Sequence, residues 1–122
     1  MSIRRTIPAL LILSLALIGW TTFHLELVAS LPDEDEVMQE PPEVVWLEFT
    51  AAPDLTRSSF SIRGPDGVVE LGDIQAGDKP EVMSAAVVGQ MQAGSYTISW
   101  VGAPADDHSV RGRFDFTIET AQ

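Results

Sequence analysis

The two histidines of this chain, His24 and His108, are the residues best suited to bind a metal. His24 follows an apolar leader, and after removal of that leader its free amine and its imidazole offer a metal two nitrogens from one residue. His108 closes the triplet Asp106-Asp107-His108, so an aspartate oxygen and a third nitrogen lie two residues apart. A tetragonal set of nitrogen and oxygen ligands favours Cu(II), which also leads the affinity order of divalent ions. The pattern predicts one Cu(II) ion held by His24, Asp106 and His108.

Asp106 and His108 have a spacing that lets both side chains reach one ion. In an extended segment, residues i and i+2 point the same way, so Asp107 between them faces away. A polar loop between two strands is the other interpretation of this triplet. For His24, the other interpretation is a histidine in a linker that follows a membrane anchor.

The first residues of the chain predict an export signal. Arg4 and Arg5 form a basic start, and residues 7–20 are an apolar run of 14 residues, which is within the range of signal peptides. Such a helix spans about 21 Å, less than the roughly 30 Å hydrocarbon core of a membrane.

Cleavage of this leader before His24 is one of two arrangements that the sequence allows. The peptidase would recognise Thr21 and Phe23, and Phe23 is larger than the small residue preferred at that position. We expect a leader over 1–23 and a domain over 24–122. The domain is periplasmic after cleavage or, alternatively, anchored to the inner membrane by an uncleaved leader.

The 122-residue chain is strongly acidic, with 7 Lys and Arg against 18 Asp and Glu and a formal net charge of -11. Loss of Arg4 and Arg5 with the leader leaves 5 basic residues against 18 acidic ones, or -13. Nucleic acids and anionic membrane surfaces bind basic patches, so we expect no nucleic acid, and a membrane only through an uncleaved leader. The chain has no cysteine, which excludes disulfides and thiolate metal ligands.

Short apolar runs alternate with turn residues after the leader, at a spacing of about ten residues. They predict about seven strands and one all-β domain, an antiparallel β-sandwich with Greek-key connections. The acidic segment 31–42 predicts a solvated loop, and Gly64-Pro65-Asp66-Gly67 a tight turn. The expected strands cover 25–29, 43–49, 58–63, 68–71, 81–88, 95–101 and 110–118. The aromatic residues expected in the core are Trp46, Phe60, Tyr96, Trp100, Phe114 and Phe116.

Four stretches that carry a resemblance are distributed along the chain after the leader, from its beginning to near its end. They are His24-Leu25-Glu26-Leu27-Val28-Ala29-Ser30-Leu31-Pro32, Gly64-Pro65-Asp66-Gly67, Gly94-Ser95-Tyr96-Thr97-Ile98-Ser99-Trp100 and Asp106-Asp107-His108-Ser109-Val110-Arg111-Gly112-Arg113-Phe114-Asp115-Phe116. In this order they resemble the mature start, the hairpin, the Gly-x-Tyr-x-Val-x-Trp strand and the closing Asp-x-His motif of the copper resistance protein C (CopC) family.

This resemblance implies a seven-stranded immunoglobulin-like or cupredoxin-like sandwich. It implies a periplasmic copper carrier, often working beside an inner-membrane copper protein of the CopD type. It also implies that His24 gives its amine and its imidazole to Cu(II), Asp106 a carboxylate oxygen, and His108 an imidazole nitrogen.

Two features of the family are missing from this chain. Some members carry a second, Cu(I) site in a Met-rich loop, but Met38, Met83 and Met91 are scattered here, so we expect no Cu(I) site. Many members also have an acidic residue near the copper where this chain reads Phe49-Thr50-Ala51.

We expect an exported copper-binding protein for copper resistance, buffering or delivery to a membrane copper protein, and no enzyme. No Ser-His-Asp order and no glycine-rich phosphate loop are visible in the sequence. Lytic polysaccharide monooxygenases also bind copper with an N-terminal and a second histidine, but an Asp ligand would fill a position that such an enzyme keeps open. The alternative function is a membrane-tethered immunoglobulin-like β-sandwich interaction module without metal.

Overall fold

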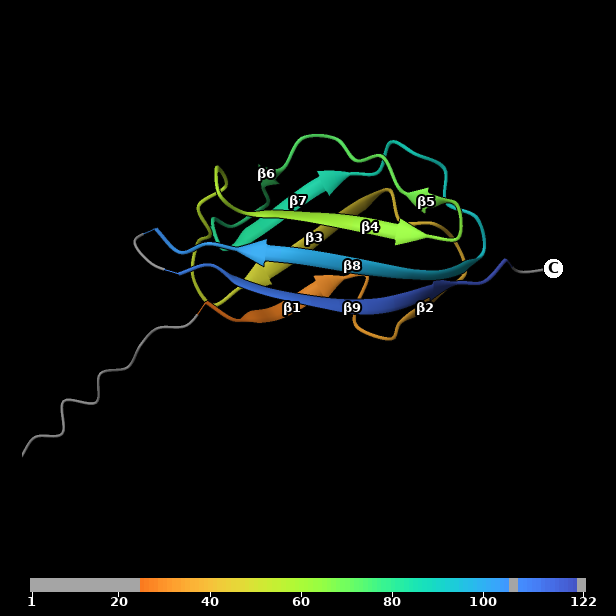
Figure 1. Ribbon diagram of the computed structural model, residues 1–122, viewed down its shortest axis with the longest axis horizontal. Coiled ribbons are helices and arrows are strands. Elements are labelled where there is room, and N and C mark those ends of the chain that lie inside the picture. The colour runs from red at the N-terminus through yellow and green to blue at the C-terminus, as the bar shows by residue number, and fades with distance from the viewer. Residues whose placement is uncertain (1–24, 106–107, 121–122) are drawn as a thin grey trace, which may run out of the picture.

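The computed structural model describes residues 25–105 and 108–120, which form nine strands and no helix. The strands, labelled in Figure 1, are β1 (Leu27–Leu31), β2 (Val37–Met38), β3 (Val44–Phe49), β4 (Ser59–Gly64), β5 (Gly67–Val68), β6 (Gln75–Ala76), β7 (Val82–Ala86), β8 (Gly94–Gly102) and β9 (Val110–Ile118). The leader over 1–23, with its expected helix, lies outside the described residues. Within those residues, no helix is long and apolar enough to cross a membrane.

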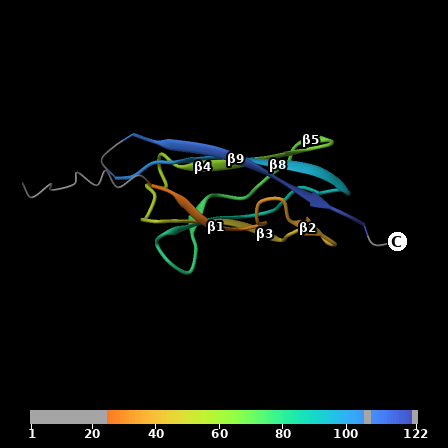
Figure 2. The ribbon, with the colours of Figure 1, turned by 90° about the horizontal axis from the view of Figure 1, so that it is seen from below.

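The strands form two sheets that pack face to face, with β4, β8 and β9 in one layer and β1 and β3 in the other (Figure 2). One sheet has the order β1-β3-β7-β6 and the other the order β2-β9-β8-β4-β5. The connections after β1, β2, β3, β5 and β7 each cross from one sheet to the other, as in Greek-key sandwiches. The predicted all-β sandwich is therefore confirmed.

Strand alternation places every second side chain between the sheets. In β3, Val45, Leu47 and Phe49 are at most 1% exposed, and in β8, Tyr96 and Ile98 are at most 3% exposed. Burial of one such side chain stabilises the fold by roughly 1.5–3 kcal/mol. Because the chain has no cysteine, this core holds the two sheets together without disulfides. Other large core side chains are Phe60, Ile62, Met83, Phe114, Phe116 and Ile118.

Trp46 is predicted to lie in the core, but it faces away from it. Its neighbours Val45 and Leu47 are 0% exposed, so alternation turns Trp46 to the outer face of the four-stranded sheet. There it pairs with Ser84 of β7 and lines a hollow beside Lys79. Because β3 carries apolar residues on both faces, its sequence pattern does not show which face is buried.

Two short strands, β2 and β6, form in segments without a strand pattern. β2 follows the acidic turn of residues 33–36 and pairs with β9 in parallel, Val37 with Thr117 and Met38 with Ile118. This parallel edge pair is a departure from the predicted antiparallel sandwich. A two-residue strand is too short to show alternation, and β2 forms because it covers part of the open edge of β9.

The predicted strand over 68–71 is divided between the two sheets. β5 pairs with β4 across the expected turn, where Gly64 lies opposite Gly67 and Gly67 has a φ of 101°, a conformation that favours glycine. The chain then crosses over, and Leu71 forms an isolated bridge with Val87 beside the other sheet. The other predicted strands agree with the structure to within two residues at each end.

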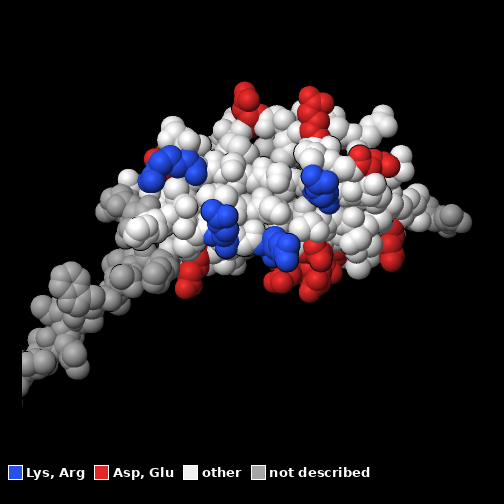
Figure 3. All heavy atoms as spheres, in the orientation of Figure 1, with Lys and Arg blue, Asp and Glu red and all other residues white. Residues whose placement is uncertain are grey.

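The outer face of the five-stranded sheet is less acidic than the chain as a whole. Arg63 on β4 and Arg111 and Arg113 on β9 occupy exposed positions of these strands. Figure 3 shows this face, with Lys and Arg side chains spread across it and Asp and Glu side chains toward its edges.

One end of the sandwich brings together segments that are far apart in sequence (Figure 1). β8 ends and β9 begins there, and β3 ends and β4 begins there. The described chain also enters at this end, ahead of β1. We call residues 50–58, between β3 and β4, the β3–β4 loop, and residues 103–109, between β8 and β9, the β8–β9 loop.

Candidate metal site

Of the three predicted copper ligands, the structure describes only His108. It lies in the β8–β9 loop, two residues before β9, and is exposed to solvent. His24 and Asp106 lie outside the described residues. Within 25–105 and 108–120, no three His, Asp or Glu side chains gather closely enough to hold a metal ion. The described neighbours of the predicted ligands therefore define the geometry of this end of the molecule.

Leu25, the residue after His24, is buried against the end of β8. It is 5% exposed and belongs to the hydrophobic core. A Cβ atom on Gly102 would lie 2.8 Å from Leu25 Cδ2 and 3.3 Å from Phe49 Cε1, so the absence of a side chain on Gly102 leaves room for both. The beginning of the described chain therefore packs on the last residue of β8.

Gly102 also lies opposite the first residue of β9. It pairs with Val110 at the end of the β8–β9 ladder. His108 precedes Val110 by two residues, a span of at most about 7 Å. Leu25, next to His24, and Val110, close to His108, thus both contact β8 at Gly102.

The β3–β4 loop holds the beginning of the described chain through Thr50. The N–H of Thr50 donates to the carbonyl of Glu26 at 2.9 Å, and the N–H of Glu26 donates to the hydroxyl of Thr50 at 3.1 Å. Glu26 lies two residues after His24. These two bonds fix the main chain where it enters β1.

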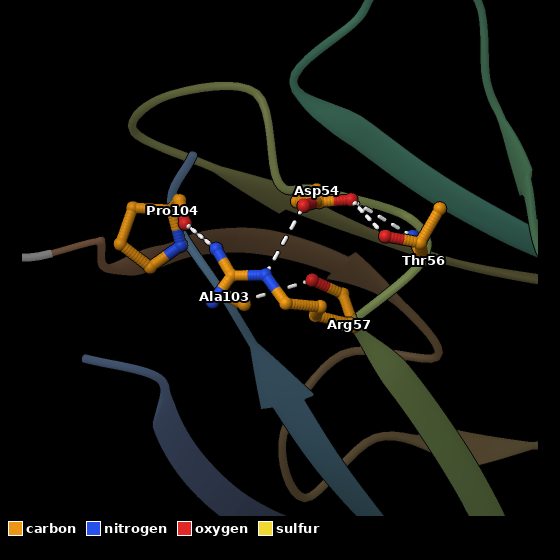
Figure 4. Close-up of polar contacts among 6 residues, drawn as sticks. Asp54, Thr56, Arg57, Ala103 and Pro104 are labelled. Carbon is orange, nitrogen blue, oxygen red and sulfur yellow. Dashed lines mark hydrogen bonds and ion pairs between the residues drawn. The ribbon is translucent and has the colours of Figure 1, made fainter. Parts of the chain in front are cut away.

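The same loop holds the beginning of the β8–β9 loop, as Figure 4 shows. The N–H of Ala103 donates to the hydroxyl of Ser58 at 2.9 Å, and the N–H of Asp54 donates to the carbonyl of Ala103 at 2.8 Å. The guanidinium of Arg57 donates to the carbonyl of Pro104. Two consecutive residues of the β8–β9 loop are therefore bound by three residues of the β3–β4 loop.

Asp54 folds the β3–β4 loop onto itself. One of its carboxylate oxygens accepts bonds from the hydroxyl of Thr56 at 2.6 Å and from the N–H of Thr56 at 3.0 Å. The other oxygen pairs with Nε of Arg57 at 3.1 Å. The hydroxyl bond of Thr56, followed by its N–H bond and by Arg57, holds the pKa of the Asp54 carboxyl below its usual range. Because both oxygens are engaged, Asp54 orients Arg57 and is poorly suited to bind a metal.

These loop residues are not evident from the sequence. The only local signal is Asp54-Leu55-Thr56, since an Asp side chain often accepts a bond from the N–H two residues later. The three bonds to the β8–β9 loop join residues that are 45, 47 and 49 positions apart. No spacing rule of strands or turns predicts such pairs.

The chemistry that this end of the molecule offers is that of nitrogen and oxygen donors. His108 provides an imidazole that is exposed to solvent. The chain has no thiolate to offer. Imidazole and carboxylate together suit Cu(II), Ni(II) or Zn(II) better than the softer Cu(I).

The comparisons with known proteins agree with this fold. A family model described as the CopC domain matches residues 27–119, a range that includes Asp106 and His108. The structure of PcoC, a methionine-rich copper resistance protein from Escherichia coli, is similar, with 24% identity, a TM-score of 0.71, and coverage of 79% of this chain and 99% of that chain. CopC from Methylosinus trichosporium OB3b is also similar, with 26% identity, a TM-score of 0.72, and coverage of 81% and 97%. No curated protein sequence matches the chain significantly.

Proposed function

The chain belongs to the CopC family, and on this basis we propose that it is an exported copper-binding protein that holds one Cu(II) ion. The ion is kept for copper resistance, for buffering, or for delivery to an inner-membrane copper protein of the CopD type. The similar structure of PcoC supports this role, since PcoC is described as a copper resistance protein.

The proposed ligands are His24, through its amine and its imidazole, Asp106 and His108. The observation that carries this proposal is the meeting of Leu25 and Val110 at the end of β8. One residue spans about 3.8 Å and two residues at most about 7 Å. The proposal is supported by the sequence distances, since His24 adjoins Leu25 and His108 is two residues from Val110.

A histidine at the start of the chain is a favourable chelator for Cu(II). The α-amine has a pKa near 8, so losing its proton to a metal at neutral pH costs only about 1 kcal/mol. The imidazole of His24 then binds within the same residue, which raises its effective concentration at the ion. Asp106 adds a negative charge and fills a further position of a tetragonal ion. A filled position leaves less room for oxygen chemistry, so we propose a carrier and not an enzyme.

The amine of His24 is available only if the leader is removed. We therefore propose a signal peptide over 1–23 and a periplasmic domain over 24–122. Mass spectrometry of the protein after export distinguishes this arrangement from the alternative. A first residue at His24 is the expected result, whereas an intact leader would favour a membrane-tethered interaction module without this site.

Titration of the domain 24–122 with Cu(II), in competition with a chelator of known affinity, tests the ligand set. We expect His108→Ala, and separately one alanine added before His24, each to weaken binding by more than about 100-fold. The reason is that each removes a ligand, and even residues that only support a metal ligand are worth about 10–100-fold in affinity.

The matched control for this titration is Ser109→Ala, an exposed neighbour of His108, and we expect it to keep the wild-type affinity. Unchanged binding by His108→Ala, or by the extended chain, would show that the ion binds elsewhere.

A further inference from the structure

The β3–β4 loop binds both of the segments that lead to the proposed ligands. Through Thr50 it holds Glu26, two residues after His24. Through Asp54, Arg57 and Ser58 it holds Ala103 and Pro104, and Pro104 is two residues ahead of Asp106. One loop of nine residues therefore connects two segments that are more than 70 positions apart in sequence.

Ala103 is held most firmly of these positions. It is 1% exposed, and both its N–H and its carbonyl bind residues of the β3–β4 loop. The Ser58 hydroxyl that accepts from its N–H is itself buried, with 5% exposure. Because buried main-chain groups are almost always hydrogen-bonded, and water does not reach this pair easily, Ser58 has no ready substitute.

Arg57 joins the two loops with a geometry that only an arginine provides. Its Nε pairs with the Asp54 carboxylate, while another nitrogen of the same guanidinium binds the Pro104 carbonyl. The donors of a guanidinium lie in one rigid plane, so the bond to Asp54 fixes the direction of the bond to Pro104. A lysine has a single nitrogen on a flexible chain and does not preserve this arrangement.

We propose that the β3–β4 loop is a clamp that sets the separation of the two ligand segments before copper binds, with Arg57 and Ser58 as its positioning residues. The proposal rests on the proposed function and adds no ligand to it, since the Asp54 carboxylate is already engaged by Thr56 and Arg57. A site whose supporting segments are fixed in advance loses less conformational entropy when the ion binds. The clamp therefore raises copper affinity without touching the ion.

Two measurements on the protein exported and purified from the full chain test the clamp. The first is Cu(II) affinity and dissociation rate for Arg57→Ala, Arg57→Lys and Ser58→Ala. We expect Arg57→Ala to bind Cu(II) about 10-fold more weakly, as for other residues that support metal ligands, with faster dissociation. Arg57→Lys should recover little of this loss, because lysine keeps the charge but not the planar geometry. The electron paramagnetic resonance spectrum of the bound Cu(II) should keep the same nitrogen ligands.

The second measurement is amide hydrogen exchange of the metal-free protein. We expect Ala103 and its neighbours in the β8–β9 loop to exchange faster in Arg57→Ala and Ser58→Ala than in the wild type. This readout does not depend on copper. If the wild type fails to bind Cu(II), the proposed function is wrong, and the exchange rates still decide whether the loop is a clamp.

Arg63→Ala is the matched control for charge. It removes the same charge from the end of β4 that is far from the β3–β4 loop. Arg63 pairs with Thr97 of β8, whereas Ser59, next to the loop, pairs with Val101, four residues further along β8. An equal decrease in Cu(II) affinity in Arg63→Ala and Arg57→Ala would overturn the clamp, because the loss of charge, and not its position, would then explain the effect. The clamp would also be overturned if Arg57→Ala kept both the amide hydrogen exchange rates and the Cu(II) dissociation rate of the wild type. The Arg57 side chain is 46% exposed, so this variant carries the test even if Ser58→Ala does not fold.

Discussion

Polar side chains of the β3–β4 loop bind main-chain atoms that lie far away in sequence. Ser58 and Arg57 bind Ala103 and Pro104, which lie in the β8–β9 loop, 45 and 47 positions away in sequence. Bonds of this kind fix the position of a loop more closely than side-chain pairs on a surface, because the main chain has fewer ways to adjust. At the scale of single residues, these groups are the positioning residues of the clamp that we propose.

The Asp54 carboxyl makes the stability of this loop depend on pH. Its contacts with Thr56 and Arg57 lower its pKa in the folded state, below the value of about 3.9 for an unfolded chain. The stabilisation is therefore fully present above the unfolded pKa, and it is lost as the pH falls through the folded pKa. We expect Asp54→Asn to be less stable than the wild type at pH 7, with a difference that shrinks below about pH 4.

Urea unfolding at pH 7 and at pH 3 measures this difference. Arg63→Ala changes the charge by the same magnitude at an exposed site on β4 and serves as the control. If the difference in the free energy of unfolding between the wild type and Asp54→Asn is equal at both pH values, the contacts of the ionised Asp54 carboxylate are not its cause.

The residues that could carry copper chemistry are visible in the sequence, whereas those that position them are not. His24, Asp106 and His108 stand out because the chain has only two histidines and because the Asp-x-His spacing is typical of two ligands on one side of an extended segment. Ser58 and Arg57 do not stand out, because a serine and an arginine near a strand start are common, and their partners are known only once the sheets are assembled. Long-range pairing is set by the fold and not by local spacing.

At the scale of elements, the β8–β9 hairpin is the frame that carries the proposed site. Its strands are nine residues each, and its pairing runs from Gly94 and Ile118 to Gly102 and Val110. Near the site end, the Trp100 ring extends across Gly112 and meets Phe49 edge-on, with ring centroids 5.3 Å apart. Gly112 has no side chain, and this gives the indole its place between the sheets.

Gly112→Ala should therefore destabilise the sandwich. A Cβ atom there would lie 2.6 Å from Cζ2 and 2.8 Å from Cε2 of Trp100, so the ring must move against Phe49. Overpacking of this kind costs about 1–3 kcal/mol. Urea unfolding followed by tryptophan fluorescence measures the loss, and the emission of Trp100 should shift as its ring is displaced.

Gly72→Ala is the control for this change. Its added Cβ would meet nothing nearer than 3.7 Å, an ordinary contact, so we expect a change in the free energy of unfolding within about 0.5 kcal/mol. Equal effects of the two substitutions would show that lost backbone freedom, and not the Trp100 contact, determines the outcome.

The long strands of this fold are predictable from the sequence, and the short ones are not. The strand β9, Val110–Ile118, agrees with its predicted range, because its Phe114, Phe116 and Ile118 alternate with polar residues. The two-residue strands β2 and β6 are not predicted from the sequence, since they form only where the edge of a neighbouring strand, β9 or β7, is available. The outward position of Trp46 escapes it too, because β3 is apolar on both faces.

At the scale of the whole molecule, the account depends on the beginning of the described chain and the β8–β9 loop lying at the same end of the sandwich (Figure 1). Leu25 follows the proposed first residue, and Val110 opens the last strand, yet both contact Gly102. The family match over 27–119 places the chain among CopC domains, but it does not include the position of His24. The central claim is therefore that His24 and His108 bind one Cu(II) ion together.

Pulsed electron paramagnetic resonance of the domain 24–122 with one equivalent of Cu(II) tests this claim most directly, because it counts the imidazoles bound to the ion. We expect two imidazoles in the wild type and one in His108→Ala. A single imidazole in the wild type, or a spectrum that His108→Ala leaves unchanged, would contradict the account.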